Sequence, residues 1–161
     1  LFSVGVVIET PSAVLMIKEI CERVDFISIG TNDLIQYTIA ADRTNETLED
    51  IISHYQPSVL RMLKLITTQV PEDTYVTICG EMANDINCLP LFIGMGIREL
   101  SMNYYSIPRI KGVIHDLSYR DCNIILNQCL ELTSPKEIKH KLINLIKKEM
   151  SSNNRIINYE I

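Results

Sequence analysis

Residues 28–37 read SIGTNDLIQY, and this stretch decides the predicted fold. An apolar, β-branched segment ends at Gly30, three polar residues follow at once, and helix-prone residues then resume. This order is typical of a buried parallel strand whose carboxyl end opens into a binding loop. Ligands in α/β folds collect at the carboxyl ends of strands. Asn32 and Asp33 are therefore candidate ligand-binding residues.

Four strand-like segments each lead towards a helix-like segment. The expected strands are 4–9, 25–30, 75–80 and 98–102, and the expected helices are 11–23, 34–41, 57–70, 85–93, 107–115, 118–130 and 135–150. This alternation predicts an α/β fold with a parallel sheet and helical crossovers. The strands are largely apolar, so we expect both faces of the sheet to be buried. Four such units make half of an eight-stranded barrel or a small open sheet, and 151–161 is expected to be a loose tail.

Bulk properties exclude several classes of protein. The chain has 161 residues, enough for one domain, and a formal net charge of -5, which disfavours binding to nucleic acid or to an acidic membrane. No apolar run approaches the roughly 20 residues of a membrane span. The five cysteines form no CxxC pair, so we expect reduced thiols and a cytoplasmic protein. Because the chain begins at Leu1, almost inside a strand, we expect a carboxyl-terminal piece of a longer protein.

Two acidic residues follow neighbouring predicted strands. Glu9 and Asp33 are 33 − 9 = 24 positions apart, a length that fits one β-α-β step and places both carboxylates on one rim. Oxygen ligands with open positions left over suit Mg²⁺ bridged to a phosphate or carboxylate of a substrate, and Mn²⁺ would suit the same oxygens. Taken alone, the pair is better explained as two acids that cap helix amino termini than as a metal site.

Two further residues could act on the same rim. Arg43 could grip a phosphate through its planar guanidinium group, although a lone arginine here more simply pairs with an acidic neighbour. Cys79 closes the third strand, where a thiol can give or take a proton, although most buried cysteines are inert. His54, His115 and His140 are scattered, and we interpret them as structural or solvent-facing.

These pieces together resemble the phosphoenolpyruvate-utilising enzymes, above all the Enzyme I family of the bacterial sugar phosphotransferase system. The runs that carry the resemblance are VIETP at 7–11, VDFISIGTNDL at 24–34, QYT at 36–38, ADR at 41–43, CGEMA at 79–83, GMG at 94–96 and SIPRIK at 106–111. They occur in the family's order and cover nearly the whole chain up to about Leu130. The segment 54–60 looks shorter than the family's usual run.

The resemblance implies that residues 1–150 are the carboxyl-terminal half of a phosphoenolpyruvate-binding (β/α)₈ barrel. It assigns Glu9 and Asp33 to the two Mg²⁺-ligand positions. It assigns Asn32, Asp33 and Arg43 to substrate positions, and Cys79 to the position of the acid that protonates the enolate carbon as pyruvate forms. Phosphoryl transfer requires mainly charge neutralisation and alignment, which such residues supply.

The implied activity is transfer of phosphate from phosphoenolpyruvate to a protein histidine, and then to the phosphocarrier protein HPr. The family carries that histidine on a separate amino-terminal domain, which this sequence lacks, and it dimerises through the barrel domain. Two alternatives stay open. The parent could be a pyruvate phosphate dikinase or phosphoenolpyruvate synthase, or this piece alone could be an inactive dimerisation module.

Overall fold

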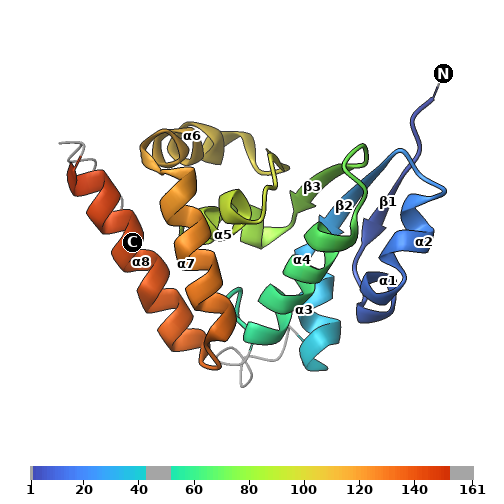
Figure 1. Cartoon of the computed structure of the whole chain (residues 1–161), viewed down its shortest axis with the longest axis horizontal. Helices are drawn as coiled ribbons and strands as arrows, with labels where there is room; N and C mark the ends of the chain where they lie inside the picture. Colours follow the sequence, from blue (N-terminus) through green and yellow to red (C-terminus); the bar gives the residue numbers. More distant parts are fainter. Residues whose placement is uncertain (1, 43–51, 153–161) are drawn as a thin grey trace.

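Four parallel strands form one sheet, and the strands lie side by side in the order in which they occur along the chain. The computed structural model describes residues 2–42 and 52–152. The strands are β1 (Gly5–Ile8), β2 (Phe26–Gly30), β3 (Tyr75–Cys79) and β4 (Glu99–Leu100) (Figure 1). In the register, Ile8 pairs with Ile29 and Ile29 pairs with Ile78. The four predicted strands are confirmed, although β4 has only two residues.

Helices connect each strand to the next. They are α1 (Pro11–Leu15) and α2 (Ile17–Cys21), then α3 (Thr31–Ile39) and α4 (Pro57–Gln69), then the 3₁₀ helices η2 (Glu81–Asn84) and η3 (Ile86–Cys88) with α5 (Leu89–Gly94), and finally η4 (Tyr104–Ser106), α6 (Ile107–Asp116), α7 (Tyr119–Glu131) and α8 (Pro135–Ser152). The helix expected over 11–23 is divided at Met16. The helix expected over 85–93 is replaced by η3 and α5, with η2 before them.

The strand order is consistent with part of a (β/α)₈ barrel. Parallel crossovers are almost always right-handed, so steps that all run in the same direction place the connecting helices on the same face of the sheet. A doubly wound sheet reverses direction at a switch point, and the order β1-β2-β3-β4 contains no such reversal. The α/β class with helical crossovers is therefore confirmed.

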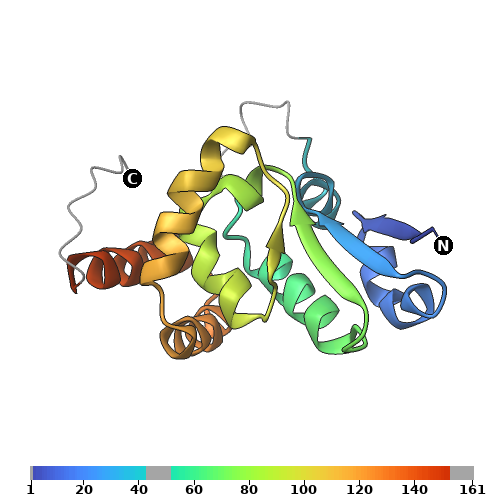
Figure 2. The same ribbon diagram turned by 90° about the horizontal axis from the view of Figure 1, so that it is seen from above.

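One face of this sheet forms the core. Ile8, Ile27, Ile29 and Ile78 are fully buried, and their side chains belong to one continuous apolar cluster that includes Leu63 of α4. Figure 2 shows α4 lying alongside β3. Burial of an isoleucine side chain contributes about 1.5–3 kcal/mol, so this face holds the strands and the helices together.

The opposite face is not covered by the described elements, and the expectation that both faces are buried is wrong for this chain. Val7 is 47% exposed, and Ser28, Thr77 and Cys79 are only partly buried. The reason is that same-direction crossovers supply helices to one face only. The alternation of Ser28 and Thr77 with isoleucines along β2 and β3 is the sequence signal of one apolar face and one partly polar face.

The end of the chain packs as two long amphipathic helices. Ile138, Leu142 and Ile146 of α8 are buried, whereas Lys136 and Lys139 are exposed. In Figure 1, α7 and α8 lie side by side at the end of the molecule opposite the amino terminus. Within residues 2–42 and 52–152, no helix combines the length and the apolar character needed to cross a membrane.

Candidate active site at the carboxyl ends of the strands

Three strand ends bring a carboxylate and a thiol together around Gly30. Glu9 directly follows β1, Gly30 ends β2, and Cys79 ends β3, where it pairs with Gly30 in the strand register. A Cβ atom on Gly30 would lie 2.6 Å from both Cγ and Oε1 of Glu9. The side chain of Glu9 therefore lies directly against the backbone of Gly30. Only a residue without a side chain leaves this space to the carboxylate.

The polar residues after β2 begin a helix instead of a loop, which corrects the expected binding loop. Gly30 is the N-cap of α3, and Thr31 is its first helical residue. Asn32 and Asp33 therefore lie in the first helical turn, where backbone N–H groups have no partner within the helix. The helix dipole favours a carboxylate such as that of Asp33 at this end.

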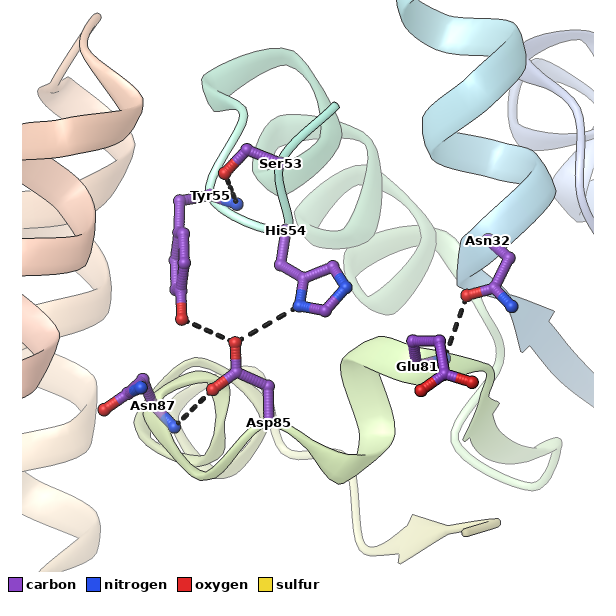
Figure 3. A network of polar contacts seen from close by, with 7 residues as sticks. All are labelled: Asn32, Ser53, His54, Tyr55, Glu81, Asp85 and Asn87. Carbon is purple, nitrogen blue, oxygen red and sulfur yellow. Dashed lines mark hydrogen bonds and ion pairs between the residues drawn. The ribbon is translucent and has the colours of Figure 1, made fainter. Parts of the chain in front are cut away.

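The start of α3 is tied to the turn that follows β3. Thr31 Oγ1 donates a hydrogen bond to the Cys79 carbonyl at 2.8 Å. The Glu81 N–H donates to Asn32 Oδ1 at 2.9 Å, a contact drawn in Figure 3. Gly80 has a φ of +97°, and a Cβ there would lie 2.6 Å from Thr31 Oγ1. Both the positive φ and the close approach of Thr31 therefore require glycine at position 80. This contact brings Asn32 beside the turn that follows Cys79.

Cys79 lies at the end of a chain of hydroxyl groups. Thr77 Oγ1 donates to Ser28 Oγ at 3.0 Å, and Ser28 Oγ donates to Cys79 Sγ at 3.3 Å. The thiol in turn lies 3.5 Å from the Ile29 carbonyl oxygen. Neither hydroxyl was predicted as part of the site, although polar residues in two otherwise apolar strands are a signal for one. The arrangement thus places a hydrogen-bond donor, the Ser28 hydroxyl, against the sulfur.

The other four cysteines differ from Cys79 because they are buried. Burial raises the pKa of the Cys122 and Cys129 thiols to about 11. Burial also raises the pKa of Cys21 and Cys88. Cys79 alone among the five is partly accessible. Of the predicted site residues, the structure thus brings Glu9 and Cys79 to the two sides of Gly30, with Asn32 and Asp33 just beyond it, whereas Arg43 lies outside the described residues.

Comparison with known proteins identifies the family. Residues 1–119 match the family model described as "PEP-utilising enzyme, PEP-binding domain". The chain belongs to the PEP-utilising enzymes. It is 41% identical over 136 residues to a phosphoenolpyruvate-protein phosphotransferase of Haemophilus influenzae, a match that covers 84% of this chain and 24% of that protein.

Two further relatives carry related names. The chain is 37% identical over 149 residues to a phosphoenolpyruvate-protein phosphotransferase of Mycoplasma genitalium, covering 92% of this chain and 26% of the relative. It is 38% identical over 138 residues to multiphosphoryl transfer protein 1 of Escherichia coli, covering 85% of this chain and 17% of the relative. The chain therefore spans about a quarter or less of the curated relatives that it matches.

A second polar cluster in this PEP-utilising chain was missed by sequence analysis, and Asp85 is its centre (Figure 3). His54 Nδ1 and the Tyr55 hydroxyl lie 3.2 Å and 2.5 Å from Asp85 Oδ2. The Asn87 N–H donates to Asp85 Oδ1 at 2.9 Å, so the same carboxylate caps η3. The cluster joins the segment before α4 to the turn after β3. No local sequence signal indicates it, because residues 54 and 85 lie 31 positions apart.

The hydrogen bonds keep the Asp85 carboxylate ionised. Burial by itself would raise its pKa, but hydrogen bonds from His54, Tyr55 and the Asn87 N–H outweigh burial and lower the pKa below its ordinary value of 3.8. A carboxyl group whose pKa is lowered on folding stabilises the fold above the unfolded-state pKa. That contribution is lost as the pH falls through the folded-state pKa.

We expect Asp85→Ala to lower the free energy of unfolding by about 2–3 kcal/mol at neutral pH, because it removes a helix cap and leaves two polar side chains without their acceptor. Urea denaturation followed by circular dichroism measures the change. Because Asp73 is exposed, Asp73→Ala is the matched control and should change stability by less than about 0.5 kcal/mol. The difference between wild type and Asp85→Ala should shrink as the pH falls below 3.8. An equal difference at about pH 7 and about pH 2 would contradict this account.

Proposed function

We propose that the protein transfers phosphate from phosphoenolpyruvate to a histidine of its own full-length chain, and from there to the phosphocarrier protein HPr, releasing pyruvate. The observation that carries this proposal is the meeting of Glu9, Cys79 and the amino-terminal turn of α3 around Gly30. The names of the relatives agree with this reaction. In the proposal, residues 1–150 are the carboxyl-terminal half of the phosphoenolpyruvate-binding barrel.

Glu9 and Asp33 are the proposed ligands of Mg²⁺, or of Mn²⁺, which suits the same oxygens. The donor set fits a hard cation, because both side chains end in carboxylates and Gly30 leaves room for that of Glu9. When bound, the ion offsets the negative charge of the transferring phosphoryl group and of the enolate oxygen. Asp33 lies in the first turn of α3, which directly follows β2, and this supports its proposed place beside Glu9.

Substrate binding is assigned to the amino-terminal turn of α3 and to Arg43. The unpaired N–H groups of such a turn suit a phosphate or a carboxylate. The Asn32 amide group adds a donor beside them, because its Oδ1 already accepts from Glu81. Arg43 is proposed to grip the phosphate through its guanidinium group. Held in this way, the phosphoryl group is aligned for direct transfer to an incoming histidine nitrogen.

Pyruvate release requires a proton at the methylene carbon of the enolate. In the proposal, Cys79 Sγ–H gives that proton, and the electron pair of the S–H bond stays on sulfur. The Ser28 hydroxyl, which donates to Cys79 Sγ at 3.3 Å, stabilises the thiolate. In the reverse direction the thiolate takes the proton back, because the same groups must serve both directions.

The proposal includes a homodimer formed through the barrel domain and a cytoplasmic protein, in keeping with five free cysteines. A nucleotide-dependent sister enzyme, pyruvate phosphate dikinase or phosphoenolpyruvate synthase, would share the residues around Gly30. A requirement of the full-length protein for ATP or AMP would favour that sister activity. By itself, the 161-residue piece is proposed to lack turnover.

The function is tested by incubating the full-length protein with phosphoenolpyruvate, Mg²⁺ and HPr and measuring phosphorylated HPr. We expect Asp33→Ala to lower the rate by about 1,000-fold or more, because the negative charge of the transferring phosphoryl group and of the enolate oxygen would then be less well offset. Asp73→Ala, at an exposed site, should keep the rate. Unchanged turnover in Asp33→Ala would remove the metal assignment.

Gly30→Ala tests the space that Glu9 occupies. The new Cβ would lie 2.6 Å from Glu9 Oε1, so the flexible carboxylate must move while the fold is kept. We expect the apparent Mg²⁺ affinity in the phosphorylation assay to fall about 10-fold or more, with less than about 1 kcal/mol lost in stability. Gly96→Ala should lower stability and leave the Mg²⁺ affinity unchanged, because Gly96 has a φ of +81° and a Cβ there would meet no atom within 4 Å. Equal effects of both changes on Mg²⁺ affinity would speak against the role of Glu9.

Cys79→Ala should lower pyruvate formation by about 100-fold or more, the range expected for a general acid. Ser28→Ala should cost less, about 10-fold, because Ser28 acts only through the sulfur. The double variant should be no slower than Cys79→Ala, since effects of groups that act as a unit are not additive. Cys129→Ala, at a buried thiol away from the strand ends, is the control for lost packing. If the rate of pyruvate formation in these variants fell only in proportion to their loss of folding stability, Cys79 would be an ordinary core residue.

A further inference from the structure

We propose that His54, Asp85 and Cys88 form a binding site for a thiophilic divalent metal ion such as Zn²⁺, distinct from the proposed Mg²⁺ ligands Glu9 and Asp33. Their possible ligand atoms, one imidazole nitrogen, one carboxylate oxygen and one sulfur, all lie within 4.8 Å of one another. Nitrogen, oxygen and sulfur ligands in this number are typical of zinc sites that keep one position open. The inference does not depend on the proposed phosphoryl transfer.

The three ligands are brought together by tertiary structure. His54 lies in the segment before α4, Asp85 is the cap of η3, and Cys88 is the last residue of η3. Asp85 and Cys88 are separated by three positions on a tight turn, which directs both towards the same point. The Asn87 N–H holds one oxygen of Asp85, and this hydrogen bond orients the carboxylate, as backbone partners commonly do for metal ligands.

The charge balance of the cluster favours a cation. The Asp85 side chain is only 17% exposed, and its pKa is lowered, so it is an anion in a largely buried place. Within the described part of the chain, His54 is its one ion-pair partner, and His54 is charged only when protonated. Hydrogen bonds from the Tyr55 hydroxyl and the Asn87 N–H already hold this anion, and a divalent ion would add a permanent positive charge beside it.

Cys88 adds the soft ligand that selects the metal. Burial, and next the Asp85 charge, raises the pKa of its thiol, so the metal-free protein keeps this proton. A coordinating thiol loses its proton outright, so binding of Zn²⁺ would replace the thiol proton with a Zn–S bond and release the proton to solvent. Hard ions such as Mg²⁺ gain little from sulfur, and this preference separates the site from the Glu9–Asp33 pair.

A cavity of about 380 Å³ gives an ion access to the cluster. His54, Tyr55 and Asp85 line it, together with Lys136 and Lys139, whereas Cys88 is fully buried and is not among the lining residues. The lysines repel a loosely held cation, so only ligands as strong as thiolate and imidazole could retain one there. Burial raises the pKa of the Tyr55 hydroxyl, which therefore stays protonated, and the fourth position is left to water from the cavity.

A metal ion here would cross-link the segment that leads into α4 to the turn that follows Cys79. The same two segments are already joined by the hydrogen bonds of His54 and Tyr55 to Asp85. The ion would therefore hold the arrangement already present. Binding to the folded state alone raises stability with metal concentration, so the expected physical effect is a higher melting temperature.

The test is a titration of the full-length protein with Co²⁺, whose bond to a thiolate gives a charge-transfer absorption that oxygen ligands do not give. We expect this band at one equivalent of Co²⁺, displaced by Zn²⁺, together with release of about one proton per Zn²⁺ in calorimetry. Cys88→Ser should abolish the band, and His54→Gln should weaken Co²⁺ binding by at least about 100-fold. Cys129→Ser, His115→Gln and Cys79→Ser are the matched controls and should keep the band.

Absence of the band in the wild-type protein would overturn the proposal, as would a band that survives Cys88→Ser. If Cys88→Ser does not fold, His54→Gln decides through the measured Co²⁺ affinity, because His54 is partly exposed at the cavity. A cluster that only holds segments together would show a lower melting temperature in His54→Gln and no Zn²⁺-dependent change in the wild type. That result would also reject the site.

Discussion

The parallel register of β1, β2 and β3 is the constraint on which the rest of the structure depends. It sets Gly30 beside Cys79, and the missing side chain of Gly30 leaves the space that the Glu9 carboxylate fills. A shift of one residue in this register would turn every side chain to the opposite face. The buried isoleucines on the other face prevent such a shift, because it would move Ile29 and its neighbours out of the core. Packing on one face of the sheet therefore positions chemical groups at its edge.

Short polar contacts then fix the pieces that the strands deliver. Thr31 and Asn32 bind the turn after β3, and Gly80 permits their close approach through its positive φ. Asp85 performs a similar task further along, where it joins His54 and Tyr55 to η3. Each contact links segments that are distant in the sequence but adjacent at one edge of the fold. Such contacts rigidify the edge at which the family is proposed to bind its substrate.

The division of the sheet into two faces agrees with the length comparison. Helices cover one face, while Val7, Ser28 and Thr77 lie on a face that the described elements leave open. In a closed barrel of eight strands, the inward face is filled by side chains from all strands. A chain that spans about a quarter of its relatives supplies only some of them. The open, half-polar face is consistent with the inner face of a partial barrel.

The sequence by itself determined the order of strands and helices, the parallel sheet, the family, and the place of Glu9, Asp33 and Cys79 near strand ends. The strands, the helices and the positions near strand ends follow from local patterns, in which each apolar run and each following glycine is read within a few residues. The family follows from the resemblance of the sequence motifs. Tertiary structure alone decided that α3 starts at Thr31, that one sheet face stays open, and that His54 meets Asp85 and Cys88. Such features depend on which distant segments become neighbours. Contacts between distant segments cannot be predicted from the spacing of apolar residues within one segment.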